Sequence, residues 1–310
     1  MANILITGGT GLVGTRLTQM LIAKGHHVII LSRRKNAVSS SGISYAFWDP
    51  QLQQIDNNAV ASADYIIHLA GAGVAEKRWT KARKLEILNS RTQSSSLLVK
   101  ALRELPNKVK AVVSSSAIGW YGPDSNDSRQ NGFEESRQAE KDFLGSTCYA
   151  WEQSIQPVAD LDKRLVILRT GIVLSKEGGA LKEFMKPVRS GVAAILGSGK
   201  QMISWIHIDD LCRMFLYAIE QPIEGVFNAV APHPVTNKEL TLVLAKKMRR
   251  SFFVPVHVPS LFLKIILGEM SIEVLKSTTV SSEKIKNAGF TFLFPALDAA
   301  LNDLLTKDHS

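Results

Sequence analysis

The feature that most constrains the fold is a regular alternation of two kinds of segment along the first half of the chain. Short segments rich in Val, Ile and Leu alternate with longer segments whose apolar residues recur at helical spacing. The short segments lie at residues 3–7, 27–31, 43–48, 64–69, 109–114 and 165–168. Strands that are apolar on both faces are typical of a parallel sheet with helices on each side. We therefore expect an α/β fold with a doubly wound parallel sheet.

A glycine-rich turn, TGGTGLVG at residues 7–14, connects the first expected strand to a helix expected at 14–24. Gly8 permits a tight turn, Gly11 lets a pyrophosphate approach the backbone, and Gly14 lets the helix pack closely on the strand. The N-terminus of the helix offers free N–H groups to phosphates. Glycines also serve plain turns, but the position between strand and helix favours a dinucleotide site and a Rossmann-like fold. The predicted contacts are Gly8, Thr10, Gly11, Leu12, Val13 and Gly14.

The end of the second expected strand selects the cofactor. NAD-binding proteins of this type carry an acidic residue there, which hydrogen-bonds to the adenosine ribose. This chain has Ser32 and Arg33 instead, followed by Arg34. A hydroxyl and guanidinium groups suit a 2′-phosphate, which a carboxylate would repel. We predict NADP(H), with a basic surface loop as the alternative interpretation.

The pattern changes after Arg169, where glycines and prolines become frequent. We expect a strand at 204–208, a helix at 209–220 and strands at 226–229 and 252–256. The prediction is an NADP-binding domain at residues 1–230, with a cap insertion at about 171–203. A smaller C-terminal domain at residues 231–310 is expected to form the rest of the cap and to contact the substrate.

Composition excludes several other classes of protein. The 310 residues are 45% hydrophobic and 21% charged, which is typical of a chain that buries a core. Cys148 and Cys212 are far apart and lack metal-ligand spacing, so we expect no metal and a cytoplasmic location. No apolar run approaches about 18 residues, so no membrane partner is expected. A strand beginning near Ile4 leaves no room for a signal peptide.

The net charge of +9 is compatible with nucleic acid, a membrane surface or an anionic ligand. The basic clusters, such as 81–84 and 246–250, are short and separated by ordinary globular sequence. Such clusters favour a solvated surface together with an anion site. We therefore expect a small-molecule substrate and no nucleic-acid partner, and the oligomeric state stays open.

Several motifs resemble those of an extended short-chain dehydrogenase/reductase. They are the glycine turn, HLAG at 68–71 and SSSA at 114–117. Other segments resemble the sugar-nucleotide-epimerase-like branch of the NAD(P)-dependent epimerase/dehydratase group, which has a small C-terminal domain of unknown function. These segments are RWT at 78–80 with EILNSR at 86–91, GSGKQMISWIHIDDL at 197–211, and LGEM at 267–270.

The resemblance implies further cofactor contacts, namely Leu69, Ala70, Gly71, Glu86, Arg91 and Val173. Leu69 and Ala70 would pass their backbone under the ribose and pyrophosphate. Glu86 and Arg91 would hold the ribose and phosphates, with a surface ion pair as the alternative. Val173 would lie near the nicotinamide, and its alternative role is that of a core valine.

Catalytic members of the resembled family use Ser, Tyr and Lys, with the last two as Tyr-x-x-x-Lys on one helix face. In the corresponding helix, expected at 141–155, Tyr149 is followed by Gln153 and Cys148 by Glu152 at this spacing, so the lysine is missing. Cys148 belongs to an apolar stripe and is expected in the core.

Ser116 matches the family's serine, and strand-end capping is its alternative role. Tyr121 and Tyr149 are the candidate substitute acids. Asp209 is expected to cap the following helix, and His207 to be satisfied structurally.

Two functions follow from these features. The first is an NADP(H)-dependent oxidoreductase or epimerase that acts on a sugar-nucleotide or small carbonyl compound. The alternative is a catalytically degenerate NADP(H)-binding regulatory or scaffold protein, because the phosphate-binding elements are present while the proton-transfer pair is not.

Overall fold

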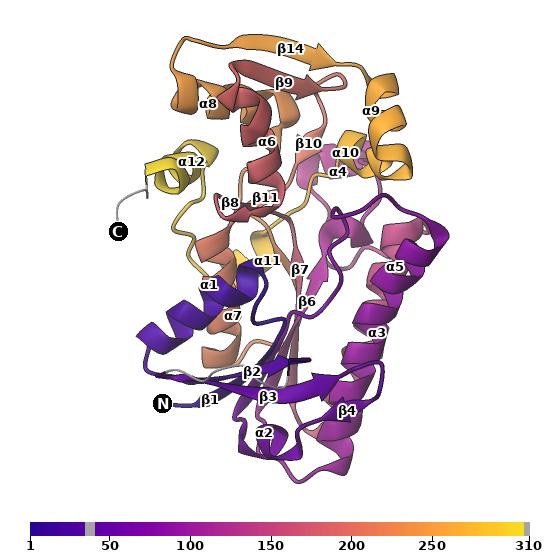
Figure 1. Ribbon diagram of the computed structural model, residues 1–310, viewed down its shortest axis with the longest axis vertical. Helices are drawn as coiled ribbons and strands as arrows, with labels where there is room; N and C mark the ends of the chain where they lie inside the picture. Colours follow the sequence, from indigo (N-terminus) through magenta and orange to yellow (C-terminus); the bar gives the residue numbers. More distant parts are fainter. Residues whose placement is uncertain (35–40, 307–310) are drawn as a thin grey trace.

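The computed structural model of the chain describes residues 1–34 and 41–306 (Figure 1). Its main element is an eight-stranded sheet in the order β12-β7-β6-β5-β1-β2-β3-β4. Adjacent strands are parallel throughout, except for the antiparallel pair β3 and β4. The strands are β1 Asn3–Thr7, β2 His27–Ser32, β3 Ile43–Asp49, β4 Gln54–Ile55, β5 Tyr65–His68, β6 Ala111–Ala117, β7 Arg164–Thr170 and β12 Gly225–Ala229. The predicted doubly wound sheet is confirmed.

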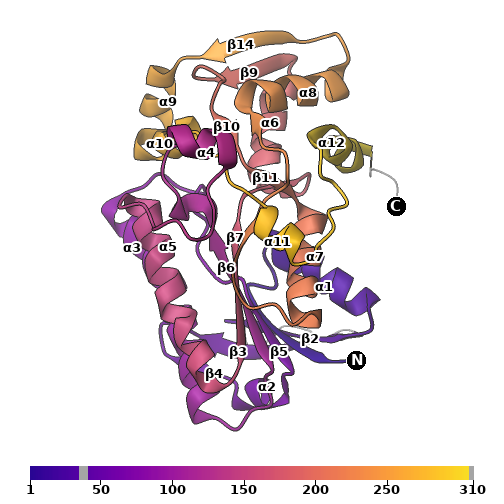
Figure 2. The same cartoon turned by 180° about the vertical axis from the view of Figure 1, so that it is seen from behind.

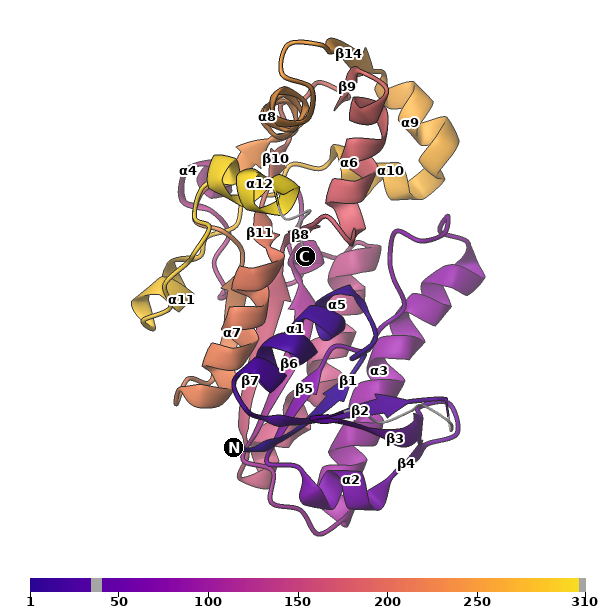
Figure 3. The same ribbon diagram turned by 60° about the vertical axis from the view of Figure 1, so that its left-hand side comes forward.

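Helices cover both faces of this sheet (Figure 3). On one face lie α1 (Leu12–Ala23) and α7 (Ile208–Glu220), which pack against each other. On the other face lie α2 (Asn57–Ser62), α3 (Lys81–Glu104) and α5 (Phe143–Ile155). Each face needs its own helices because the strand residues between them are buried on both sides.

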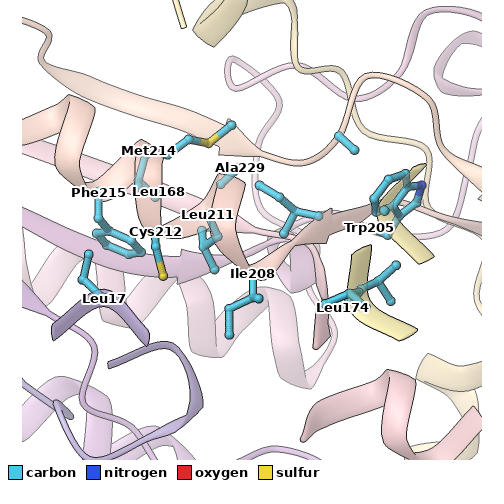
Figure 4. Close-up of a cluster of buried hydrophobic side chains, with 14 of the residues drawn as sticks. Leu17, Leu168, Leu174, Trp205, Ile208, Leu211, Cys212, Met214, Phe215 and Ala229 are labelled. Atoms are coloured by element: carbon cyan, nitrogen blue, oxygen red, sulfur yellow. The ribbon is translucent and has the colours of Figure 1, made fainter. Parts of the chain in front are cut away.

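The core between the sheet and the helices α1 and α7 extends into the cap. Leu17 of α1 and Phe215 of α7 lie near Leu168 of β7, while Trp205 and Leu174 continue the cluster beyond the sheet (Figure 4). All five side chains are fully buried. The cap is therefore joined to the sheet by continuous apolar packing.

The cap lies beyond the carboxyl ends of the central strands (Figures 1 and 2). Strand β9 pairs in parallel with β14, so residues of the insertion and of the C-terminal region share one small sheet. Two further strand pairs, β8 with β11 and β10 with β13, lie between this sheet and the main one. The strand expected at 252–256 is found at 254–258.

The elements of the cap and of its connections have the following bounds. The strands are β8 Ile172–Ser175, β9 Val192–Leu196, β10 Met202–Ile203, β11 Trp205–His207, β13 Val235–Thr236 and β14 Val254–Val258. The α-helices are α4 Asn126–Asn131, α6 Gly179–Arg189, α8 Asn237–Arg249, α9 Ser260–Leu267, α10 Ser271–Leu275, α11 Glu283–Asn287 and α12 Leu297–Thr306. The 3-10 helices are η1 Ile118–Trp120, η2 Gln156–Leu161 and η3 Gly268–Met270.

The strand order places a topological switch point between β1 and β5. From β1 the chain proceeds outward to β2 and β3, whereas β5, β6 and β7 extend in the other direction. In open sheets of this kind, ligands bind beyond the carboxyl ends of the strands at the switch point. The glycine turn and the HLAG segment follow β1 and β5, and both are therefore at this position.

Candidate functional site

The glycine turn is packed directly against the chain that leaves β5. Gly8 has φ of 70°, and a Cβ on it would lie 3.0 Å from the carbonyl of Leu69. A Cβ on Gly14 would overlap the carbonyl oxygen of Gly8. Gly11, the N-cap of α1, donates its N–H to that same oxygen at 3.0 Å and has no side chain to occupy the first-turn N–H groups. The turn is thus a cradle that fits a pyrophosphate at a helix N-terminus.

Thr10 and Gly11 are exposed in this turn, while Leu12 and Val13 are half-buried at the beginning of α1. Leu12 and Val13 pack against the apolar core, which holds the first turn of the helix in place. The structure therefore brings all the turn residues predicted from the sequence together at the switch point.

A buried hydrogen-bond chain fixes the end of β5 beside this turn. The Oγ1 of Thr7 accepts hydrogen bonds from the N–H groups of Leu69 and Ala70, each at 3.1 Å. Its own hydrogen therefore goes to Nδ1 of His68, at 2.7 Å. The Nε2–H of His68 then donates to Oγ of Ser95 at 3.1 Å. Burial, together with the charge of Arg91, lowers the pKa of His68 to about 3, so the ring is neutral.

Arg91 lies next to Gly71, which follows Leu69 and Ala70. A Cβ on Gly71 would come within 3.1 Å of Cζ of Arg91. Arg91 donates through Nη1 to the carbonyls of Ala72 and Ile87, at 3.0 and 2.9 Å, and its Cζ lies 4.9 Å from the ring centroid of Trp151. Burial lowers the pKa of this guanidinium. The predicted residues Gly71 and Arg91 thus form one contact beside the switch point.

Glu86 makes the ion pair that the sequence left open as its alternative role. Its carboxylate accepts from Nη1 of Arg83 at 2.8 Å and is 57% exposed, while the side chain of Arg83 is buried. The hydrogen bond from Arg83 holds the pKa of Glu86 below its usual range.

The predicted adenosine and nicotinamide ends of the site have different surroundings. Ser32 ends β2, and its Oγ accepts the N–H of Arg34 at 3.0 Å. Arg33 and Arg34 are exposed beside it. Val173 lies in β8, opposite Ile206, and packs against the apolar core. Val173 is half-buried there, so part of its side chain contacts the core and part is accessible.

A closed network of polar side chains lies at the ends of β6 and β7. Ser116 donates its Oγ hydrogen to Oε1 of Glu152 at 2.6 Å. Arg169 donates to both carboxylate oxygens of Glu152, from Nε at 2.9 Å and from Nη2 at 3.0 Å. The guanidinium also lies 3.6 Å from the ring centroid of Trp120. All four side chains are buried, so this is a desolvated and fully paired charge pair.

Tyr121 belongs to the same network and is fully buried. Its hydroxyl donates to Oδ1 of Asn228 at 2.7 Å and accepts from Nη1 of Arg169 at 3.1 Å. The Asn228 amide donates in turn to the carbonyls of Phe133 and Ser281. Burial raises the pKa of Tyr121 to about 12. A phenol with these partners is held neutral and has its donor and acceptor both engaged within the protein.

The third candidate acid, Tyr149, lies apart from this network. Its side chain is 52% exposed and its ring centroid is 6.1 Å from that of Trp120. Cys148, the preceding residue, is buried as predicted from the apolar stripe of α5. Burial raises the pKa of the Cys148 thiol to about 12. The structure therefore connects Ser116 to Tyr121 through Glu152 and Arg169, and leaves Tyr149 on the surface.

Sequence reasoning missed the roles of Glu152, Arg169 and Asn228. A signal was present for two of them. Arg169 is a charged residue within an apolar strand, and Glu152 lies four residues after Cys148 on a helix face that is otherwise apolar. Charges at buried positions are normally paired. Together they indicated a buried ion pair.

The predicted cap at Asp209 is wrong. His207 is the N-cap of α7, and its Nδ1 accepts the N–H of Asp209 at 3.0 Å. The Asp209 carboxylate instead accepts from Nε and Nη2 of Arg16, at 2.7 and 2.9 Å, and so connects α7 to α1. Asp209 lies in the first helical turn, where its charge is also favourable to the helix dipole. Within residues 1–34 and 41–306, no group of three or more His, Cys, Asp or Glu side chains is arranged to hold a metal ion.

The fold and the switch-point cradle define a dinucleotide-dependent class of protein, and sequence comparison agrees. The family model described as "NAD dependent epimerase/dehydratase family" matches residues 4–229, and a domain of unknown function, DUF1731, matches residues 258–304. The chain therefore belongs to the NAD dependent epimerase/dehydratase family, as its motifs indicated. Membership places it in the general class of NAD(P)-dependent oxidoreductases and epimerases.

Individual relatives match over almost the whole chain. An epimerase family protein of Staphylococcus saprophyticus is 37% identical over 308 residues, covering 98% of this chain and all of the relative. The epimerase family protein YfhF of Bacillus subtilis is 34% identical over 305 residues, covering 98% of each chain.

Two solved structures are also similar. The crystal structure of human epimerase family protein SDR39U1 (isoform 2) with NADPH is 31% identical, with a TM-score of 0.87, and the match covers 98% of this chain and 99% of that one. A nucleoside-diphosphate sugar epimerase from Corynebacterium glutamicum is 31% identical, with a TM-score of 0.77. That match covers 98% of this chain and 58% of the other.

Proposed function

We propose that the protein is an NADP(H)-dependent oxidoreductase or epimerase that acts on a sugar-nucleotide or a small carbonyl compound. The observation that carries the proposal is the glycine turn at the switch point. Its close backbone packing would be disrupted by a Cβ on Gly8 or Gly14, and the N-cap of α1 has no side-chain hydrogen bond to the first-turn N–H groups. The Thr7–His68 chain holds the neighbouring Leu69 and Ala70 backbone beside it. NADPH in the similar human structure supports the same class of cofactor.

In this proposal the pyrophosphate lies on the N–H groups of the turn, from Gly8 to Gly14. Ser32 and Arg33 bind the 2′-phosphate, and Arg91 with Glu86 borders the ribose and phosphates. Val173 lies toward the nicotinamide. The bound cofactor supplies a hydride acceptor or donor, and the protein supplies position and a path for the substrate proton.

Ser116 is the proposed residue that contacts the substrate. Its hydroxyl hydrogen is committed to the carboxylate of Glu152, so its lone pairs remain for a donor. Such a serine accepts a hydrogen bond from a substrate hydroxyl group. Tyr121 has both of its hydrogen-bonding roles occupied, which makes Tyr149 the more accessible of the two candidate acids.

The proposed organisation follows the predicted domains. Residues 1–230 form the NADP-binding domain, and the insertion at about 171–203 together with residues 231–310 forms the substrate-side cap. Pairing of β9 with β14 supports a shared cap. A cytoplasmic location fits two free, buried cysteines.

Titration of the purified protein with NADPH and NADH, followed by fluorescence, tests the cofactor. We expect tighter binding of NADPH, and Arg33→Ala should weaken it by about 10- to 100-fold while NADH affinity stays constant. Arg103→Ala, an exposed arginine in the last turn of α3, is the matched control. Equal affinity for the two cofactors in the unaltered protein would contradict the NADP(H) assignment.

Activity is tested separately with a panel of nucleotide sugars and small carbonyl compounds. Product analysis is needed in addition to NADPH absorbance, because an epimerase returns the hydride and leaves absorbance unchanged. Turnover that is lost in Ser116→Ala supports catalysis. The second candidate, a cofactor-binding regulator, is favoured by the missing Tyr-x-x-x-Lys pair and predicts tight NADPH binding without turnover.

A further inference from the structure

Exposed apolar side chains are concentrated in one part of the cap. Among the described residues, fourteen large hydrophobic side chains are exposed, and eight of them lie between residues 252 and 272. These eight, which we call the cap apolar face, are Phe252, Val254, Val256, Leu261, Phe262, Ile265, Ile266 and Ile272. Their exposed fractions range from 43% to 79%. Scattered exposed hydrophobics are ordinary, but a concentration of this kind within one stretch of the chain is typical of an interaction surface.

Helix α9 shows that the exposure is directional. Leu261, Phe262, Ile265 and Ile266 share one side of the helix, because residues four apart lie above one another. These side chains are 51% to 69% exposed, whereas Leu263, on another side, is 7% exposed. A surface helix normally presents polar residues outward. Here the outward side is aliphatic and aromatic. Helix α9 therefore carries more apolar side chains than it buries within the cap.

Basic residues accompany the cap apolar face. The segment 246–276 contains six Lys or Arg and two Glu. Lys247 and Lys276 are largely buried in ion pairs, and the other four cations are exposed. Arg249 and Arg250 precede β14 and are exposed, and the exposed Lys264 lies within α9. An apolar helix side bordered by cations matches an anionic bilayer, where apolar side chains enter the acyl boundary and cations reach the headgroups. An isologous contact with a second copy would instead place two positive segments against each other.

The cap apolar face is distributed over β14, α9 and α10, with Phe252 just before β14. Strand β14 lies at the end of the cap away from the eight-stranded sheet, in two opposite views (Figures 1 and 2). Within the part of the chain that the structure describes, no helix is long and apolar enough to cross a membrane.

We propose that the cap apolar face, with its basic border, docks the protein on the surface of an anionic lipid bilayer. This departs from the expectation, drawn from the sequence, that the protein has no membrane partner. The inference concerns the outer end of the cap and does not depend on the cofactor or the substrate.

Vesicle flotation of the full chain tests the proposal. We expect binding to phosphatidylcholine vesicles that contain about 30% phosphatidylglycerol, and weak binding to phosphatidylcholine alone. Raising the salt from about 0.05 M to about 0.5 M should reduce the bound fraction, since the cationic contribution is screened. The double variant Phe262→Ser/Ile265→Ser should lose at least about tenfold in partitioning. Lys264→Glu should weaken binding to the anionic vesicles and leave the weak binding to neutral vesicles unchanged.

Leu52→Ser/Leu293→Ser is the matched control, because these residues are exposed to a similar extent outside the face, at 64% and 58%. The control should bind vesicles like the unaltered chain. Thermal unfolding and NADPH binding of each variant report whether it is folded. No binding to anionic vesicles, or equal loss in the control, overturns the proposal. A dimer in light scattering that Phe262→Ser/Ile265→Ser dissociates, without vesicle binding, would assign the face to a second copy instead.

Discussion

The two halves of the sheet's carboxyl edge are built from different chemical groups. At β1 and β5 the surface consists mainly of backbone, with glycines, first-turn N–H groups and the Leu69–Ala70 segment held by Thr7. At β6 and β7 it consists of side chains that satisfy one another, from Ser116 through Glu152 and Arg169 to Tyr121. The first half presents backbone N–H groups that can donate to an anion. In the second half, most side-chain donors already form hydrogen bonds within the protein. Cofactor affinity and rigidity are therefore expected to reside in different halves.

The largest effect on stability should follow from breaking the buried ion pair at the ends of β6 and β7. Arg169→Met leaves the Glu152 carboxylate buried without its cationic partner, which should lower the free energy of unfolding by about 3–5 kcal/mol. Chemical denaturation followed by fluorescence measures this change. The double variant Glu152→Gln/Arg169→Met should recover part of the loss, because no unpaired charge remains. A loss below about 1 kcal/mol in the single variant would show that the pair is solvated and the network open.

A smaller loss of stability is expected from a substitution in the glycine turn, and this substitution should also weaken cofactor binding. Gly14→Ala places a methyl group against the Gly8 carbonyl, at a cost of about 1–3 kcal/mol, and should weaken NADPH binding at least about tenfold. Gly25→Ala is the control, since nothing lies within 4 Å of its added Cβ and only its φ of 79° is unfavourable. Titration calorimetry and denaturation separate the two consequences. Unchanged NADPH affinity in Gly14→Ala would remove the turn from the proposed site.

An effect of similar size, which needs no substitution, should appear in the same half of the edge as a pH dependence of the free energy of unfolding. The pKa of His68 is about 3 in the folded protein, whereas an ordinary histidine has a pKa of 6.5, so the unfolded chain takes up a proton that the native protein excludes. The stabilisation is complete above about pH 6.5 and falls progressively toward pH 3. Between pH 7 and pH 5 the exclusion of this proton should lower the free energy of unfolding by about 2 kcal/mol.

Denaturation curves at several pH values, compared between the unaltered chain and His68→Gln, isolate this contribution. The variant should show a shallower decline below pH 6.5. Parallel pH profiles would mean that His68 titrates normally in the folded protein, and that the Thr7–His68 chain does not keep the imidazole neutral.

The sequence was informative wherever local physics decides the structure. The buried strands could be predicted because a short segment with an apolar centre, such as residues 3–7, is typical of a buried strand, and β1 occupies that range. The glycine turn could be predicted because its tight backbone geometry requires residues without a Cβ. Ser32 and Arg33 were identified by their position at the end of a strand, and their predicted contact with a 2′-phosphate stays a prediction.

The hydrogen-bond network at β6 and β7 could not be predicted in the same way, because its side chains come into contact only after the sheet has assembled. Ser116 and Glu152 are 36 positions apart, and Tyr121 and Asn228 are 107 apart. Arg169 and Glu152 each stand out as a charge among apolar neighbours, but the sequence does not say which buried groups become partners. Asp209 was misread for a related reason: a capping pattern places an acid before a helix, but the preceding His207 accepted the N–H first.

The pairing of β9 with β14 has a consequence for how the chain acquires its structure during synthesis. The first pair of the small sheet joins residue 192 to residue 254. Because β9 emerges from the ribosome well before β14, this sheet cannot form until the later strand has been synthesised. Closing a loop of this length carries an entropic cost and slows formation of the contacts that depend on it. A nascent chain halted before β14 would hold β9 unpaired, and the cap would be the last part of the protein to mature.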